Sequence, residues 1–418
     1  LLHLAAPALR PPELSRSMRQ LSLGGERLFT SGVSGGVGGG GLGRSARSQL
    51  RMLGAEHSGQ INLYALDDTE LAELMVELGQ PKYRAKQLKA WLYGESPAKT
   101  FDDMNNLPKA LRAGLGERAT LGSMQVAAEQ VSQDGTRKRL WRCTDDSLIE
   151  SVLMPYDTRR RTACISSQVG CAMGCTFCAT GQMGFRRHLS EAEIFEQAAR
   201  FASELREKDE RLSNVVFMGM GEPFRNYDAV LAAARRIMKD LGIGARHITI
   251  STVGLVPEIR RFADDIADGD LGEIKLAISL HESDDASRSA LMPVNRKYDL
   301  DTLFDACRYY VERTGRRISF EWALIAGQND DATSARALAA RLRGLKCHVN
   351  LIPLNPTRGF YGQPTSLPDA EVFVRTLEKN GIPATVRVRR GIDIDAGCGQ
   401  LADAASKETA AERLAAKS

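Results

Sequence analysis

The chain has 418 residues, which is enough for two or three domains around a large buried core. Its hydrophobic content of 43% and charged content of 26% are ordinary for a globular protein. The net charge of +4 is too small to establish a polyanionic partner, although local basic clusters can still bind one. Because no apolar run approaches the roughly 20 residues that span a bilayer, we expect no transmembrane helix and no membrane partner.

Residues 1–60 are predicted to form a disordered extension or a transit peptide. Residues 35–43 are nearly all glycine, as in a flexible linker. Arginine and serine are frequent before Glu56, where Glu13 and Glu26 are the only acidic residues, and this composition resembles an organelle transit peptide. A disordered extension or an over-extended gene model explains the same composition equally well.

Residues 61–120 show a helical pattern. Apolar side chains recur at i, i+3, i+4 and i+7 from Leu71 to Leu78, which makes one apolar helix face. Two more helices are expected, one over residues 85–92 and one after Pro108, so we predict a small N-terminal helical domain. Its basic residues include Lys82, Arg84, Lys86 and Lys89. On charge alone these read as a solvated helix face.

The pattern changes to short strands over residues 121–156. Asp134-Gly135 is a hairpin turn signal, and Asp145-Asp146 marks a second turn. We therefore expect an antiparallel β linker between the helical domain and the remainder of the chain.

Strands and helices alternate over residues 157–401. The predicted strands are 162–167, 215–218, 247–251, 274–279, 318–324, 348–352 and 384–388. Helical patterns between them include 191–205, 227–241, 300–313 and 332–342. This alternation predicts an α/β fold, a partial parallel (β/α)6-type barrel whose site lies at the C-terminal ends of the strands. Residues 402–418 are predicted to be a flexible tail.

The most informative motif is Cys171-Ala-Met-Gly-Cys175-Thr-Phe-Cys178, in which one loop supplies three of the eight cysteines. This distribution indicates a metal or redox site in a reducing compartment and not a secreted disulfide framework. Iron–sulfur clusters are held by cysteine thiolates, and a four-iron cluster with three of them keeps one iron open to chelate S-adenosylmethionine. The alternatives are a structural zinc with Cys164 or His188 as fourth ligand, and coincidental core thiols.

A glycine-rich turn follows the second predicted strand, where residues 218–223 read Met-Gly-Met-Gly-Glu-Pro. Glycines there let the backbone approach a ligand, and Glu222 can accept hydrogen bonds from an ammonium group. A simple tight turn gives the same pattern, but its place beside the cysteine motif favours a ligand site. Other polar residues at predicted strand ends are Ser251, Ser279, His281 and Asn355. Each alone reads as a cap or turn residue, and only their shared placement favours a ligand site.

Two further cysteines stand apart from the triplet. Cys398 lies between Gly397 and Gly399 on a predicted loop, where it is accessible and suited to act as a nucleophile. Cys164 lies seven residues before Cys171 on the first predicted strand, and from the residues alone it reads as a buried strand thiol.

Together these motifs resemble the RlmN/Cfr family of radical S-adenosylmethionine RNA adenosine methyltransferases. The resemblance runs from about Leu63 to Leu401 and is strongest over residues 164–171, 171–178, 218–223 and 395–401. It implies a radical S-adenosylmethionine barrel and a four-iron, four-sulfur (4Fe-4S) cluster held by the three loop cysteines.

The resemblance also implies a reaction that uses two S-adenosylmethionine molecules per turnover. One methylates Cys398, and the second yields a radical that removes a hydrogen from that methyl group, which then adds to C2 of adenine. Cys164 attacks Cys398 to release the RNA and leave a Cys164–Cys398 disulfide. Glu150 matches the position that accepts the ring proton, although by itself it reads as a solvated strand residue. The implied S-adenosylmethionine contacts are Gly221, Glu222, Ser251, Ser279, Leu280, His281 and Asn355.

The partners implied by the resemblance are large-subunit rRNA, tRNA and a reducing electron donor such as flavodoxin or ferredoxin, with a monomeric enzyme. We expect RNA contacts from the helical domain and from basic clusters, since phosphate contacts supply sequence-independent affinity. The clusters are Arg159-Arg160-Arg161, Arg186-Arg187 and the group Arg387, Arg389 and Arg390.

Two alternatives stand beside this interpretation, and the compartment is open. A C8-specific adenosine methyltransferase of the same family shares every motif, and a non-enzymatic zinc-containing RNA-binding protein is the alternative from another class. The family is cytoplasmic, whereas the Arg- and Ser-rich N-terminus points to a plastid or mitochondrion.

Overall fold

The computed structural model describes residues 55–56, 59–157, 159–269 and 271–402. The predictions for most of the extension 1–60 and for nearly all of the tail 402–418 therefore lie outside the described residues. Within the described ranges, no helix has both the length and the hydrophobicity to cross a membrane.

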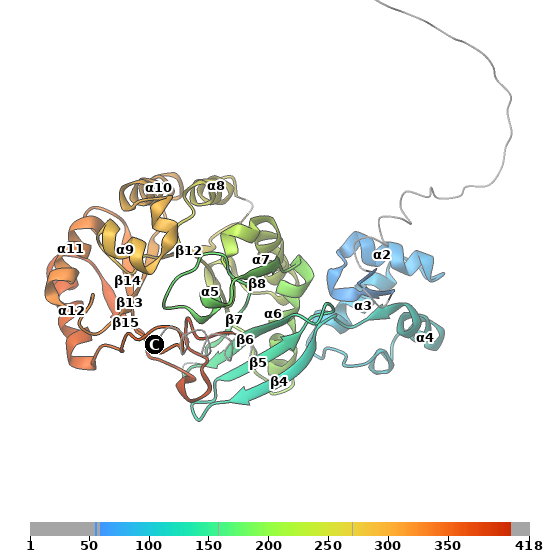
Figure 1. Cartoon of the computed structure of the whole chain (residues 1–418). Coiled ribbons are helices and arrows are strands. Elements are labelled where there is room, and N and C mark those ends of the chain that lie inside the picture. Colours follow the sequence, from blue (N-terminus) through green and yellow to red (C-terminus); the bar gives the residue numbers. More distant parts are fainter. Residues whose placement is uncertain (1–54, 57–58, 158, 270, 403–418) are drawn as a thin grey trace, which may run out of the picture. The chain divides into compact units, whose positions relative to one another are not determined.

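The centre of the fold is a twisted sheet whose parallel strands follow the chain (Figure 1). Its order is β15-β14-β13-β12-β11-β10-β7-β6-β5-β4, and pairing is parallel from β7 to β15. The parallel strands are β7 (Arg161–Cys164), β10 (Asn214–Phe217), β11 (Ile248–Thr252), β12 (Lys275–Ser279), β13 (Ile318–Leu324), β14 (Cys347–Pro353) and β15 (Ala384–Val386). The predicted α/β fold class is confirmed.

The strands predicted as a linker belong to the same sheet. They are β4 (Gln125–Val131), β5 (Arg137–Arg142) and β6 (Leu148–Pro155), each antiparallel to the next. β6 also pairs antiparallel with β7, with Val152 opposite Cys164. The meander is thus an extension of the barrel sheet, because the edge of β7 offers unpaired backbone groups that β6 satisfies.

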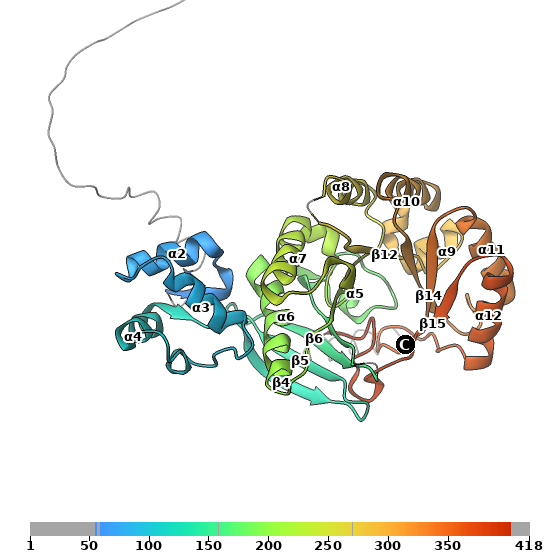
Figure 2. The same ribbon diagram turned by 180° about the vertical axis from the view of Figure 1, so that it is seen from behind.

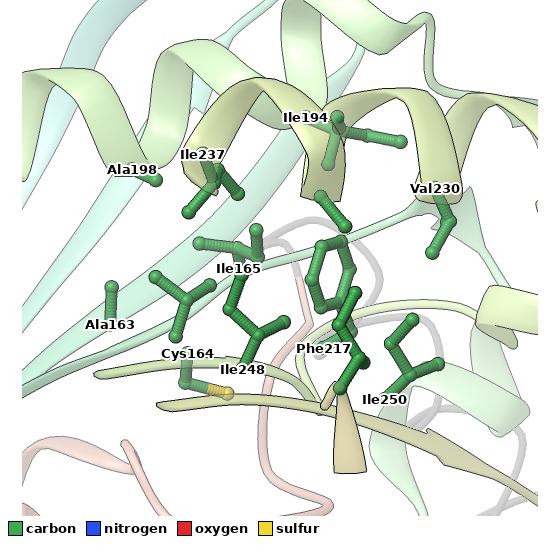
Figure 3. Packing of buried hydrophobic residues seen from close by; sticks show 14 of the residues in the cluster. Ala163, Cys164, Ile165, Ile194, Ala198, Phe217, Val230, Ile237, Ile248 and Ile250 are labelled. Carbon is green, nitrogen blue, oxygen red and sulfur yellow. The ribbon is translucent and has the colours of Figure 1, made fainter. Parts of the chain in front are cut away.

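Helices follow the parallel strands and cover the sheet (Figures 1 and 2). They are α6 (Glu191–Arg206), α7 (Tyr227–Leu241), α8 (Val256–Ala267), α9 (Asp285–Leu291), α10 (Leu300–Thr314), α11 (Ala332–Leu342) and α12 (Leu367–Lys379). Short 3-10 turns lie at Leu63–Ala65, Phe101–Asp103, Pro223–Asn226, Ala245–His247, Pro293–Arg296 and Ile392–Ile394. In Figure 3, Ile194, Val230 and Ile237 of α6 and α7 pack onto Phe217 and Ile250 of the strands. This apolar layer fixes the strand ends that carry the site.

The N-terminal helices are α2 (Asp68–Glu77), α3 (Arg84–Tyr93) and α4 (Lys109–Arg118), beside a small sheet of β1 (Ala55–Glu56), β2 (Gln60–Asn62) and β3 (Ala119–Thr120). Asp67 caps α2 in a reciprocal capping box with Glu70.

Aromatic packing joins the N-terminal helices to α6 and α7. Phe195 is fully buried and meets the rings of Tyr64 and Tyr93 edge-on, with centroids 6.1 and 5.4 Å away. The guanidinium of Arg236 lies 4.2 Å from the Phe195 ring centroid and donates to the Tyr93 hydroxyl at 3.0 Å. Lys89 pairs with Asp240 of α7 at 2.7 Å, so this part of the predicted solvated face is a contact within the fold.

We predict that Phe195→Ala lowers the free energy of unfolding by about 3–5 kcal/mol, because it removes a buried ring and leaves a cavity. Val372→Ala is the control, since Val372 lies exposed on α12 and its truncation should cost less than about 1 kcal/mol. Denaturant unfolding followed by circular dichroism measures both. Equal, small losses would show that the aromatic contact does not hold these helices on the barrel.

Candidate active site

A cavity opens where the parallel strands end. Its empty volume is about 1080 Å³, and its walls come from most of the strand ends and from the loop after β8. The lining includes Cys171, Cys175, Cys178, Gly221, Glu222, Ser251, Ser279, His281, Asn355 and Cys398. The sequence-predicted ligand residues are therefore brought together, with the exception of Leu280.

The three-cysteine loop is held at its base by a hairpin that the sequence did not reveal. β8 (Gln168–Gly170) and β9 (Phe185–His188) pair antiparallel on either side of the loop and of the short helix α5 (Ala179–Met183). The Cys171 N–H donates to the Gly184 carbonyl at 2.9 Å, and Thr176 N–H donates to the Leu291 carbonyl at 2.9 Å. These bonds anchor both parts of the loop, so the three sulfurs share one wall of the cavity.

The chemistry of the three thiols fits an iron–sulfur cluster. Burial raises the pKa of Cys171 to about 12 and raises the pKa values of Cys175 and Cys178 as well. Buried thiolates therefore need a compensating positive charge, which bound iron supplies. Among the described residues, no group of three or more His, Cys, Asp or Glu is arranged to hold one metal ion. A cuboidal cluster sets a different requirement, because its thiolates bind separate irons.

Glu222 lies in the wall of the cavity with its carboxylate fixed by backbone donors. Its Oε1 accepts from Phe224 N–H at 3.0 Å and its Oε2 from Val253 N–H at 2.8 Å. Burial raises the pKa of Glu222 to about 7. A cationic ligand group beside it would favour the ionised carboxylate.

Gly221 lets the backbone beside Glu222 pass close to β8. Its φ is +103°, and a Cβ there would lie 2.6 Å from Cβ of Gln168. The side-chain oxygen of Gln168 accepts from Glu222 N–H at 2.8 Å. The glycine is therefore needed for both its conformation and its close approach.

His281 is a neutral hydrogen-bond donor to the cavity. Its Nδ1 accepts from Ala323 N–H at 2.8 Å, which leaves the ring hydrogen on Nε2. Burial, followed by the charge of Arg288, lowers the pKa of His281 to about 3. Its φ of +63° turns the chain sharply at the end of β12.

Arg288 ties the strand ends together, and sequence reasoning missed it. This guanidinium is almost fully buried and donates to the carbonyls of Val253 at 2.7 Å, Ser279 at 3.2 Å and Leu280 at 3.1 Å. Leu280 is fully buried and does not line the cavity, and its expected contact with S-adenosylmethionine stays a prediction. Leu280 presents its carbonyl to Arg288.

A smaller cavity of about 470 Å³ adjoins the first, and the two remaining predicted cysteines both lie in its wall. Cys164 at the end of β7 lines it with Cys398, and both are free thiols in this structure. Asn355 lines both cavities, and its Nδ2 donates to the Cys398 carbonyl at 3.1 Å. Its Oδ1 is buried and accepts no hydrogen bond from any described residue. Such an orphaned oxygen suits a ligand donor.

Arg387 also lines both cavities. Its Nη1 donates to Sγ of Cys398 at 3.1 Å. The sequence placed Arg387 among RNA-binding arginines, but its side chain is turned inward to the sulfur. Nothing in the sequence spacing marks this contact.

Glu150 lies outside both cavities. It is buried, its Oε2 accepts from Ala402 N–H at 2.9 Å, and its Oε1 lies 3.3 Å from Nζ of Lys138. Its expected character as a solvated strand residue is wrong, because the segment at Ala402 covers it.

Several predicted RNA-binding arginines are engaged within the fold. Arg161 pairs with Glu210 at 2.6 Å, and Arg187 pairs with Asp145 and Glu193. Arg186 and Arg389 are exposed.

Comparisons with known proteins agree with this architecture. The family model described as "Radical SAM superfamily" matches residues 165–337, and that described as "Ribosomal RNA large subunit methyltransferase N-terminal domain" matches residues 61–121. The dual-specificity RNA methyltransferase RlmN 1 of Myxococcus xanthus is 48% identical over 343 residues, 81% of this chain and 94% of the relative. The probable RlmN of Bacillus subtilis is 44% identical over 344 residues, 81% of this chain and 92% of the relative.

A solved structure shares the fold. The crystal structure of a radical SAM methyltransferase from Sphaerobacter thermophilus has 47% sequence identity and a TM-score of 0.77. The match covers 81% of this chain and 98% of that chain.

We predict that Gly221→Ala lowers S-adenosylmethionine affinity about tenfold or more, a change of about 1.4 kcal/mol, because the added Cβ would displace Gln168 or Glu222. Gly242→Ala is the matched control, with a positive φ of +67° at the end of α7 and no atom within 4 Å of the new Cβ. Both substitutions cost stability through φ, but only the first should change binding, measured by equilibrium dialysis. Equal affinities would remove Gly221 from the ligand site.

Proposed function

Because the chain belongs to the RlmN family of radical S-adenosylmethionine RNA methyltransferases, we propose that it methylates C2 of an adenosine in 23S-type rRNA and in tRNA through a methylated Cys398. Membership in the radical S-adenosylmethionine superfamily implies a 4Fe-4S cluster and S-adenosylmethionine binding. The relatives' names, which call them dual-specificity RNA methyltransferases, support two classes of RNA substrate.

One observation carries the proposal: Cys398 lines both the cluster cavity and the cavity that contains Cys164. A sulfur in that position can receive a group in the first cavity and be attacked from the second. An enzyme that transferred a methyl group directly to RNA would need neither cysteine.

When bound, the cluster and S-adenosylmethionine supply the methyl group and the radical chemistry that activates it, with two S-adenosylmethionine molecules per turnover. The chain's own residues then divide the work. Sγ of Cys398 accepts the methyl and carries it to the RNA. Sγ of Cys164, after it has lost its proton, then attacks Sγ of Cys398 and forms a disulfide. The bond from Cys398 to the RNA-linked carbon breaks, its electron pair stays with that carbon, and a proton from solvent completes the methyl group on adenine.

Glu150 is proposed to accept the ring proton. Its carboxylate is held by Ala402 and Lys138, so it reaches RNA only when the contact with Ala402 opens. The loop from Gly397 to Ala402 then has two tasks, to present Cys398 and to uncover Glu150.

The ligand and partner assignments follow the same scheme. The residues proposed to bind S-adenosylmethionine through the wall of the first cavity are Gly221, Glu222, Ser251, Ser279, His281 and Asn355. Leu280 is proposed as a further contact, although it does not line that cavity. Residues 61–120 are proposed as the RNA-binding domain. The enzyme is proposed to act as a monomer with a flavodoxin or ferredoxin as electron donor, and its compartment stays a prediction.

The two alternatives are not favoured by the comparisons. The relatives are named RlmN, which does not favour a C8-specific enzyme of the family. The identity of 48% with a methyltransferase does not favour a non-enzymatic zinc protein.

We predict that Cys164→Ala traps a covalent complex between RNA and Cys398, because a second thiol is needed to break the sulfur–carbon bond that joins Cys398 to the RNA. Cys347→Ala is the control, since Cys347 is a buried thiol on β14 outside both cavities. Denaturing gel electrophoresis with labelled RNA detects the complex. Normal turnover by Cys164→Ala would remove its proposed role.

The position of the methyl group tests the proposed function itself. Ribosomal and transfer RNA methylated by the reconstituted enzyme should yield 2-methyladenosine after nuclease digestion and mass spectrometry. Formation of 8-methyladenosine would contradict the assignment to C2 but would still agree with an adenosine methyltransferase of the same family.

A further inference from the structure

We propose that Arg387 stabilises the negative charge of two sulfurs in turn, first Cys398 when it takes the methyl group and then Cys164 when it attacks Cys398. This inference rests on the proposed function. It assigns Arg387 a direct contact with a reacting atom, where the sequence indicated an RNA contact.

The backbone fixes where this guanidinium can reach. Arg387 follows β15 directly, and its N–H donates to the Leu351 carbonyl on β14 at 2.7 Å. The side chain then extends into the cavity shared by the two cysteines. Nη1 lies 3.1 Å from Sγ of Cys398, and Nη2 lies 3.9 Å from Sδ of Met154.

The charges around Arg387 favour the sulfur as its partner. The Cys398 sulfur is the first cause that raises the pKa of Arg387 above its usual range, ahead of Glu321, Tyr156 and Cys164. The carboxylate of Glu321 is already engaged, because its Oε2 accepts from Asn350 Nδ2 at 2.6 Å and its Oε1 from Ser319 Oγ at 3.1 Å.

The first step needs a thiolate. The Cys398 thiol loses its proton to solvent, and the sulfur attacks the methyl carbon of S-adenosylmethionine. A carbon–sulfur bond forms on Cys398 while the sulfonium carbon–sulfur bond breaks, and its electron pair leaves with S-adenosylhomocysteine. A guanidinium at hydrogen-bond distance favours the charged sulfur and keeps its own protons throughout.

Methylation then changes the partner of Arg387. The methylated Cys398 sulfur is a neutral thioether, so the guanidinium no longer faces an anion there. Burial and, after it, the charge of Cys398 raise the pKa of Cys164 to about 12, while Arg387 acts in the opposite direction. Removing the charge of Cys398 therefore favours the Cys164 thiolate, and the attacking sulfur is activated only after its target has been loaded.

The rate at which iodoacetamide alkylates Cys398 tests the first half of the proposal. The anaerobically purified holoenzyme is treated without RNA over a range of pH, and modified peptides are quantified by mass spectrometry. Arg387→Met should slow alkylation at neutral pH about tenfold or more, because it removes the donor to the Cys398 sulfur, whereas Arg387→Lys should keep a rate close to wild type. Arg387→Gln gives the same comparison if the methionine variant loses its fold.

Arg389→Met is the matched control, because Arg389 is an exposed cation that lines the same small cavity. Its alkylation profile should match that of the wild type. Equal profiles for wild type and Arg387→Met would overturn the proposal.

The second half is tested on enzyme whose Cys398 has been methylated with S-adenosylmethionine. Cys164 should then be alkylated faster than in the unmethylated enzyme, and Arg387→Met should abolish this gain. If methylation of Cys398 does not speed the alkylation of Cys164 in the wild type, the proposal that Arg387 then stabilises Cys164 is overturned. Failure of the wild type to methylate Cys398 at all would instead contradict the proposed function, while the alkylation profiles would still decide whether Arg387 acts on Cys398.

Discussion

A sulfur atom buried in a protein carries negative charge only when a positive charge lies beside it, and the site of this enzyme is arranged around that constraint. The three cysteines of the loop after β8 have thiols whose burial raises their pKa values above the usual range, so their thiolates would depend on the positive charge of the proposed cluster. Cys398 sits further along the cavity with Arg387 against its sulfur. Cys164 lines the smaller cavity with Cys398, and burial is the main cause that raises its pKa to about 12.

The fold supplies this arrangement through the ends of its parallel strands. Most of these strands deliver one or two polar residues to the first cavity, and β7 delivers Cys164 to the smaller one. Arg288 donates to carbonyls at the ends of β11 and β12 and so holds these strand ends together. The hairpin of β8 and β9 holds the cluster loop. The final segment from Gly397 to Ala402 then closes both cavities and brings Cys398 beside a strand that precedes it by more than half the chain.

The fold class could be predicted because it follows from local sequence patterns: alternating apolar strands and amphipathic helices indicate the barrel. The spacing of Cys171, Cys175 and Cys178 likewise supports the proposal that their loop holds the cluster, and the structure brings all three to the cavity. Arg387 and Arg288 could not be found this way, because each is one arginine among many and its partner is distant in sequence. The burial of Glu150 beneath Ala402 depends on a contact across 252 positions and was also missed. Leu280 follows a strand as expected, but periodicity does not show that its carbonyl accepts a hydrogen bond from Arg288.

The central claim is that the methyl group rests on Cys398 and loses a hydrogen there before it reaches RNA. S-adenosylmethionine with a fully deuterated methyl group tests this most directly, with the mass of the methylated adenosine as the measurement. The account predicts that the methyl group in RNA has lost one deuterium and that this deuterium is recovered in the adenosyl product. A methyl group that arrives in RNA with all of its deuterium would contradict the account, because it would have passed directly from donor to base.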